Sequence, residues 1–148
     1  MKLPYNPFDR LSELAALQIA IYTEVARQHH LTLNELHFLY FIGRYGAVSP
    51  SKIGDTWSLP KQTVTSVCKQ LAKKNLLTFL VDEKDKRSKL IHLSPQGKDF
   101  IKPIIDKMTE AELSVSQYFG FARFETLLND TETILDKLAT HLNTSKTE

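Results

Sequence analysis

Short polar and long basic side chains recur at helical spacing between residues 61 and 73. The apolar residues of this segment fall at i, i+3, i+4 and i+7, which predicts a helix whose inward face is Val64, Val67, Cys68 and Leu71. The opposite face and its flanks offer hydroxyl and amide groups that suit base edges, and ammonium groups that suit phosphates. These outward residues are Lys61, Gln62, Thr63, Thr65, Ser66, Lys69 and Lys73. Any amphipathic surface helix also has a polar face, so the neighbouring elements must decide between the two interpretations.

A second basic cluster follows, between two runs of alternating hydrophobicity. Leu77, Phe79 and Val81 predict one face of a strand, and the run 91–93 alternates in the same way after the charged segment 82–89. Two such runs around a charged turn predict a β-hairpin. Its tip carries Lys84, Asp85, Arg87 and Lys89. An arginine at such a tip suits the negative potential of a narrow DNA minor groove, although a surface ion pair between Asp85 and Arg87 is the alternative.

Three predicted helices precede these segments. The first begins near Asn6 and Pro7 and runs to about Gln28, with an apolar stripe too wide for a single partner surface. Thr32 and Glu35 form a capping box that opens the second helix, with Leu36, Leu39, Tyr40 and Ile42 inward and an end near Gly46. Ser49 and Pro50 open a short third helix, with Ile53 and Trp57 as its apolar positions. A short helix, a turn, a second helix and a hairpin together predict a winged helix-turn-helix.

Two long helices complete the predicted fold, which is mainly α with a small β-hairpin wing. Ser94 and Pro95 open the fifth helix, and Gly120 separates it from a sixth helix with a leucine-rich face. We therefore expect a single domain over 1–148. Within it we expect a DNA-binding lobe over 32–96, helical dimerisation segments over 6–30 and 98–143, and a frayed tail over 143–148.

The composition fits a small globular protein. Hydrophobic residues make up 42% of the 148 residues and charged residues 24%, which argues against disorder. The net charge is only +2, but the window 49–98 holds ten basic and four acidic residues while the remainder holds nine basic and thirteen acidic. Such a cationic middle is expected of a lobe that faces phosphates. The single cysteine, and the lack of a signal peptide or a long apolar run, predict a cytoplasmic protein without membrane association.

These motifs resemble the MarR family of winged helix-turn-helix transcription regulators over nearly the whole chain. Asp85-Lys86-Arg87 followed by Leu93-Ser94-Pro95-Gln96-Gly97 is similar to the family's wing signature. Thr63 to Ser66 and Leu71 to Leu77 resemble its recognition helix and the exit into the wing. Two departures are visible: Asn75 replaces the usual glycine, and Asp82-Glu83-Lys84 replaces an earlier Asp-x-Arg. The first changes little because asparagine tolerates the same left-handed backbone, whereas the second loses a guanidinium fork.

The resemblance implies a regulator that binds double-stranded DNA at a pseudo-palindromic operator as a homodimer, most often as a repressor that a ligand releases. In that interpretation Arg87 reaches the minor groove or a phosphate, Asp85 orients the wing loop, and the two ends of the chain form the dimer. A winged helix that serves as an interaction module, without sequence-specific DNA binding, is the alternative. The residues offer no phosphate loop, nucleophile elbow or zinc-protease motif, so we expect no enzyme activity and no cofactor.

The resemblance also implies a cleft for a small aromatic or lipophilic effector. Its candidate lining residues, each of which could equally fill the core or the surface, are Tyr22, His30, His37, Tyr40, Phe41 and Arg44. We expect no metal site, because adjacent His29 and His30 point to different faces of a helix. A redox-sensing role for Cys68 is a further alternative, but its inward position predicts a core thiol.

Overall fold

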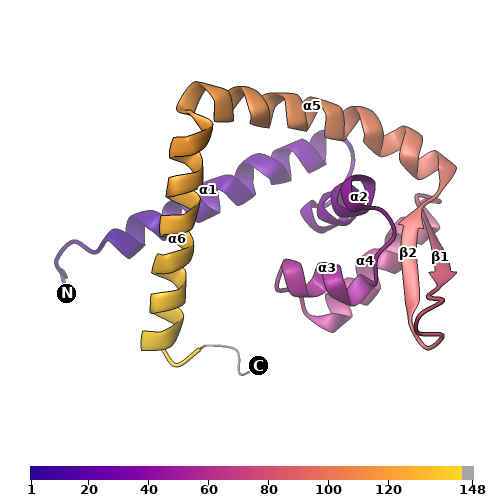
Figure 1. Ribbon diagram of the computed structural model, residues 1–148, viewed down its shortest axis with the longest axis horizontal. Helices are drawn as coiled ribbons and strands as arrows, with labels where there is room; N and C mark the ends of the chain where they lie inside the picture. The colour runs from indigo at the N-terminus through magenta and orange to yellow at the C-terminus, as the bar shows by residue number, and fades with distance from the viewer. Residues whose placement is uncertain (145–148) are drawn as a thin grey trace. The chain divides into compact units, whose positions relative to one another are not determined.

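The computed structural model describes residues 1–144, which form six helices and one two-stranded antiparallel hairpin (Figure 1). The predicted mainly helical winged helix-turn-helix fold is therefore confirmed. Along the chain the elements are α1 Pro7–Gln28, α2 Leu33–Tyr45, α3 Pro50–Thr56, α4 Lys61–Lys73, β1 Leu77–Val81, β2 Lys89–Leu93, α5 Pro95–Phe119 and α6 Phe121–His141. No helix among the described residues is long and apolar enough to cross a bilayer. Most of the tail predicted to fray lies outside the described residues.

The chain divides into two compact units, and the boundary falls inside α5. The N-terminal unit is Met1–Ile105, and the C-terminal unit begins at Asp106. The N-terminal unit contains all the elements from α1 to β2 and the first part of α5, whereas the C-terminal unit holds the rest of α5 and α6. The assignment of lobes to 32–96 and to the flanking helical segments remains a prediction.

Local capping sets the helix starts of the N-terminal unit where the sequence predicts them. The Asn6 side chain accepts from the Phe8 N–H, and the capping box of Thr32 and Glu35 has both of its hydrogen bonds. Ser49 caps α3, and the Ser94 hydroxyl accepts from the Gly97 N–H at the start of α5. Each cap satisfies backbone donors that a helix start leaves free.

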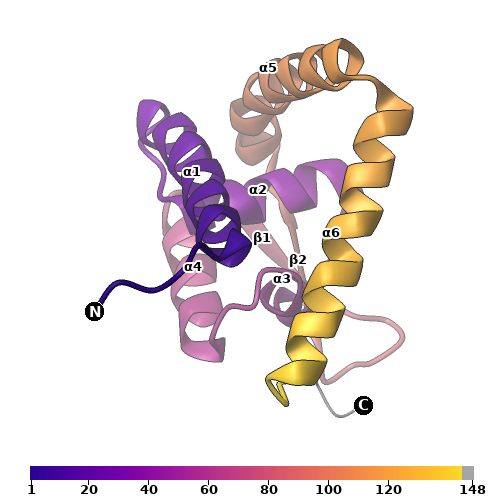
Figure 2. The same cartoon turned by 90° about the vertical axis from the view of Figure 1, so that its left-hand side faces the viewer.

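The core of the N-terminal unit is centred on α2, with α1 and α4 both beside it (Figure 2). Leu36, Leu39 and Ile42 are buried as predicted, and Tyr40 is half-buried. Phe38 is also fully buried, although the predicted stripe omits it, because partners cover α2 on more than one side. Of the two apolar positions of α3, Ile53 is fully buried, whereas Trp57 caps the end of the helix and is 40% exposed.

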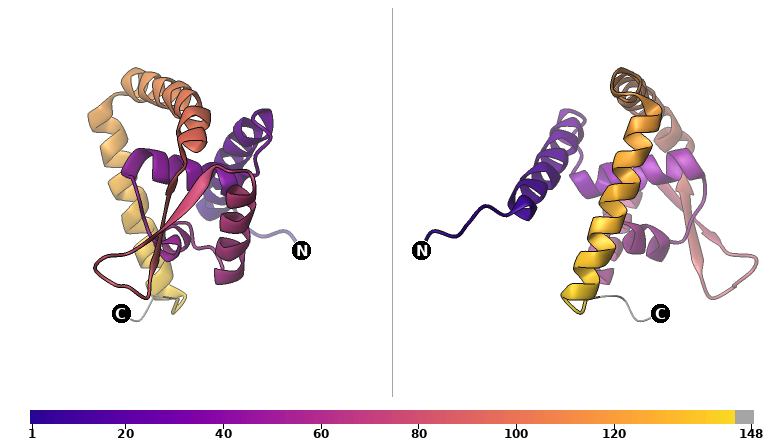
Figure 3. Two further views of the ribbon diagram at one scale, coloured as in Figure 1. Left: turned by 90° about the vertical axis from the view of Figure 1, so that its right-hand side faces the viewer. Right: turned by 60° about the vertical axis from the view of Figure 1, so that its left-hand side comes forward.

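The hairpin attaches to this core at its base. Leu77 pairs with Leu93 and Val81 with Lys89, and Val48 adds a short bridge to Ile91. Leu77, Ile91 and Leu93 are buried, but Phe79 and Val81 are exposed despite the alternation, because the hairpin extends away from α2 and α4 (Figure 3). Gly97 packs directly against the Leu76 carbonyl, where any side chain would collide with backbone.

Candidate nucleic-acid interface

Helix α4 has the two faces that the sequence predicts. Val64, Val67, Cys68 and Leu71 are buried against the core. The Thr65 hydroxyl donates to the Lys61 carbonyl at 3.1 Å, so part of its bonding capacity is used within the helix. Of the predicted contact residues on α4, Thr63 is half-buried and the exposed ones are Lys61, Gln62, Thr65, Ser66, Lys69 and Lys73.

An open groove of about 380 Å³ lies between α4 and the start of α2. Three predicted contact residues line it, namely Gln62, Thr63 and Ser66. The sequence analysis missed its other lining residues, which are Thr32, Asn34, Val67 and Gln70. Gln70 could have been found, since it follows Ser66 by four residues and Thr63 by seven on one stripe of the helix. The groove offers hydroxyl and amide groups with no formal charge.

The wing tip is shaped by carboxylates that accept hydrogen bonds from the loop. Asp85 accepts from the Arg87 backbone N–H and from the Ser88 hydroxyl, each at 3.1 Å. Asp82 accepts from the Lys84 backbone N–H at 3.0 Å. Within the described residues the Arg87 guanidinium is in no ion pair, so Asp85 holds the backbone of the loop rather than the side chain of Arg87. Lys84, Asp85, Arg87 and Lys89 are all exposed.

Cys68 is a core residue in this structure. Its side chain is buried on the inner face of α4, and burial raises the pKa of its thiol to about 11. Such a thiol stays protonated at neutral pH, and the thiolate is the form that reacts with oxidants. The redox interpretation therefore lacks both the exposure and the low pKa that it requires.

The six candidate effector residues lie on or near α1 and α2. His37 stacks on Trp57 with ring centres 4.0 Å apart, and burial lowers the pKa of His37. Phe41 packs against Tyr45 at 4.9 Å, and the Arg44 guanidinium lies 5.8 Å from the centre of the Tyr40 ring. His30 has a left-handed backbone and is exposed, and Tyr22 is half-buried. None of the six lines the groove beside α4. No group of three metal-binding side chains occurs in the part of the chain that the structure describes.

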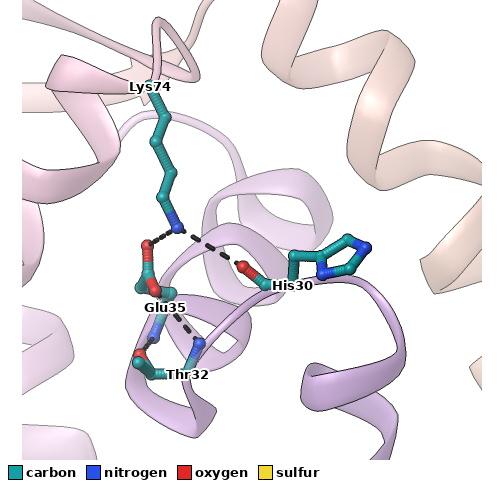
Figure 4. Close-up of polar contacts among 4 residues, drawn as sticks. All are labelled: His30, Thr32, Glu35 and Lys74. Carbon is teal, nitrogen blue, oxygen red and sulfur yellow. Dashed lines mark hydrogen bonds and ion pairs between the residues drawn. The ribbon is translucent and has the colours of Figure 1, made fainter.

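An ion pair that the sequence analysis missed lies at the end of α4 (Figure 4). The Lys74 Nζ is 2.7 Å from the Glu35 Oε2, and it also donates to the His30 carbonyl at 3.5 Å. The other carboxylate oxygen of Glu35 accepts from the Thr32 N–H at 3.0 Å. Burial alone would raise the pKa of Glu35, but the hydrogen bonds from Lys74 and Thr32 and the Lys74 charge lower it overall. The carboxylate is therefore ionised inside the protein.

Comparison with known proteins identifies the family. The model of the MarR family matches residues 29–88, which run from the end of α1 into the wing. A MarR family regulator from Neisseria meningitidis, NMB1585, is 30% identical in sequence, and its structure matches with a TM-score of 0.83 over 96% of this chain and 100% of that chain. The chain belongs to the MarR family of winged helix-turn-helix transcriptional regulators. Members of this family are not enzymes.

Two solved structures of lower sequence identity share the fold, and a curated relative matches part of the chain in sequence. The MepR–DNA complex of S. aureus has a TM-score of 0.72 at 17% identity, over 91% of this chain and 99% of that chain. NadR in complex with 4-hydroxyphenylacetate has a TM-score of 0.71 at 16% identity, over 94% of this chain and 96% of that chain. The regulator Hpr of Exiguobacterium sibiricum is 31% identical over 85 residues, which cover 57% of this chain and 45% of that protein. This MarR-family chain spans about half the length of the curated relatives it matches.

Proposed function

We propose that this protein binds double-stranded DNA sequence-specifically as a homodimer and regulates transcription as a repressor in the cytoplasm. The observation that carries the proposal is the outward polar and basic face of α4, held on a buried apolar face beside a basic wing. A helix of this kind fits the major groove, and a hairpin tip fits the adjacent minor groove. The DNA complex of MepR, which has the same fold, supports this use.

Helix and wing have different roles in this proposal. Gln62 is the one residue of the outward α4 set whose amide can make a bidentate contact with a base, while Thr65 and Ser66 contribute single hydrogen bonds. Lys61, Lys69 and Lys73 neutralise phosphates, and the uncharged groove beside α4 accepts one sugar-phosphate strand through hydroxyl and amide contacts. Arg87 enters the minor groove or contacts a phosphate, from a loop that Asp85 holds in shape.

The homodimer is proposed from apolar surface that one chain leaves exposed. Leu14, Leu17 and Ile21 are exposed on α1, and Leu128 and Leu135 are exposed on α6. Clusters of exposed apolar side chains such as these usually belong to an interface with another protein. A two-fold dimer would present two α4 helices to successive major grooves about 10 base pairs apart, which requires a pseudo-palindromic operator.

The proposal includes a small aromatic or lipophilic effector that releases the DNA. NadR binds 4-hydroxyphenylacetate, and aromatic and basic side chains in the candidate set suit such an acid. Tyr22, Tyr40 and Arg44 are the strongest candidates, because a phenolic acid needs aromatic packing and a cation. They act together with His30, His37 and Phe41 in this proposal.

Selection from a random duplex library tests the function. The native protein should enrich one pseudo-palindromic sequence, whereas an interaction module without sequence preference would enrich none. Affinities for the selected duplex and a scrambled duplex are then measured at several salt concentrations, for native protein and two variants. Gln62→Ala should reduce the preference for the selected duplex by roughly 1–3 kcal/mol, and it should leave binding to scrambled DNA nearly unchanged.

Arg87→Ala should instead weaken binding to both duplexes. It should make the plot of log affinity against log salt less steep by about 0.9 for each subunit, near 2 for the dimer. Lys86→Ala, at a neighbouring wing position, is a matched charge control. An Arg87→Ala protein with native affinity and salt dependence would remove the wing from the DNA contact.

A further inference from the structure

Lys74 is the basic residue next to α4 that points back into the protein. It follows Lys73 directly and caps the end of α4, yet its ammonium group contacts the Glu35 carboxylate at 2.7 Å and the His30 carbonyl at 3.5 Å (Figure 4). The side chain of Glu35 is only 3% exposed, while that of Lys74 is 43% exposed. Lys74 therefore differs from Lys69 and Lys73, whose exposed side chains are free to meet phosphates.

Three parts of the N-terminal unit meet at this pair. Glu35 belongs to the first turn of α2, where its other oxygen closes the capping box with Thr32. His30 lies in the turn between α1 and α2 and has a left-handed backbone, with φ of 57°. Lys74 joins α4 to Asn75, whose φ of 60° directs the chain into β1. The pair thus ties the end of α4 to the start of α2, 39 residues away in sequence.

Only the carboxylate of this ion pair is buried, while the ammonium group reaches it from a side chain that is 43% exposed. Taking a carboxylate out of water costs much of what its attraction to a cation returns, so we expect the pair to contribute more to orientation than to stability. The hydrogen bonds of such a pair are directional and permit few alternative arrangements. The same edge of α4 forms the groove in which Gln62, Ser66 and Thr32 face one another.

We propose that Glu35 and Lys74 are positioning residues that set the placement of α4 for base recognition, with Lys74 contacting Glu35 rather than a phosphate. The inference rests on the proposed DNA-binding function and deepens it. Base contacts need groups placed to within a fraction of an ångström, whereas phosphate contacts tolerate displacement. Loss of the Glu35–Lys74 pair should therefore reduce sequence discrimination far more than it reduces binding to arbitrary DNA.

Glu35→Gln is the decisive variant, because glutamine keeps the capping-box acceptor toward Thr32 and loses only the charge that faces Lys74. The selected-to-scrambled affinity ratio should fall about tenfold, comparable to the loss of one base contact. The salt dependence should stay at the native value. Lys74→Arg, as a single change, retains the cation that faces Glu35. It should keep most of the native selected-to-scrambled affinity ratio.

Two controls separate positioning from stability and from phosphate contact. Thr32→Ala removes the cap of α2 and one hydroxyl of the groove but leaves the Glu35–Lys74 pair. It should lower stability and weaken binding to the selected and scrambled duplexes alike, so the affinity ratio should not change. Lys73→Met removes an exposed cation one residue earlier and should lower the salt slope by about 0.9 for each subunit. Lys74→Met combined with Glu35→Gln avoids an unpaired buried charge and should match Glu35→Gln alone.

Two results of the DNA-binding measurements would overturn the inference, and a third comes from hydrogen exchange. One is an unchanged affinity ratio in Glu35→Gln, and the other is a salt slope lowered by Lys74→Met with Glu35→Gln as much as by Lys73→Met. Hydrogen exchange of the α4 amides gives a readout that needs no DNA, and it should be faster in Glu35→Gln than in Thr32→Ala. If native protein selects no sequence, the proposed function fails, while equal exchange in the two variants would reject the positioning role by itself.

Discussion

The two units of this chain differ in how far they bury their own apolar residues. The N-terminal unit encloses Phe38, Leu39 and Ile53 completely. In the C-terminal unit no described residue is buried, and α6 leaves Leu128 and Leu135 about half exposed. Both units contain long helices, so helix formation alone does not explain the difference. What differs is the number of elements available to cover each apolar face.

This contrast indicates where folding is complete within one chain and where it needs a partner. A helix gains most of its stability from packing an amphipathic face, and an isolated helix in water is marginal. The N-terminal unit supplies such packing from α2, α3, α4 and the hairpin, although its α1 leaves Leu14, Leu17 and Ile21 exposed. The apolar face of α6 has no equivalent cover within its own unit. In the proposed homodimer, a second copy of the chain covers this face.

The largest effect is expected from charges on the apolar face of α6. Leu135→Glu combined with Leu138→Glu should abolish the dimer, because a two-fold interface would bury four unpaired carboxylates. Light scattering should find monomers or insoluble protein. Glu132→Lys combined with Lys137→Glu, at exposed α6 positions, is the control for charge changes on this helix. Native-like dimers in the leucine double variant would exclude α6 from the interface and leave its exposed leucines without a covering partner.

The elements predicted correctly from the sequence are those that depend on local chemistry. Asn6, Thr32 and Ser94 cap helices as predicted, because a cap bonds to backbone two or three residues away. Asn75, which replaces the usual glycine, has the left-handed backbone that the sequence predicts for this position. These features need no knowledge of the tertiary fold.

Burial that depends on distant elements could not be predicted from the sequence. Trp57 caps the end of α3 and lies on the margin of the core against His37, and Phe79 lies on a hairpin that extends away from the core. Phe38 falls outside the predicted stripe, because α2 is covered on several sides. The Glu35–Lys74 pair joins residues 39 apart, and no local pattern in one sequence indicates it.

An intermediate effect on stability is expected at Cys68, in the core of the N-terminal unit. Cys68→Ser should lower the free energy of unfolding by about 1–3 kcal/mol if the hydroxyl finds no partner, as measured by chemical denaturation. Cys68→Ala should cost less, because it leaves no unsatisfied polar group there. Mild peroxide should not affect DNA binding by the native protein, because burial holds the thiol pKa near 11. Peroxide-sensitive binding that becomes resistant in Cys68→Ser would replace the core interpretation with a redox switch.

The smallest effect is expected at the His37–Trp57 stack, on the margin of the same core. Burial lowers the pKa of His37 from its ordinary value of 6.5, so the unfolded chain takes up this proton at higher pH than the folded protein does. The corresponding stability is present above pH 6.5 and is lost as the pH falls through the folded-state pKa. Trp57 is the only tryptophan of the chain, and its ring centre lies 4.0 Å from that of His37.

Tryptophan fluorescence can therefore follow this single titration. A protonated imidazole quenches a stacked indole, so native protein should lose intensity with a midpoint below pH 6.5. His37→Gln should remove that transition, whereas His29→Gln, at the end of α1, should retain it. A native midpoint at or above pH 6.5 would mean that His37 is as solvated as a histidine in an unfolded chain. The margin of the core between α2 and α3 would then be open to water, and the contrast between the two units would be weaker than their burial indicates.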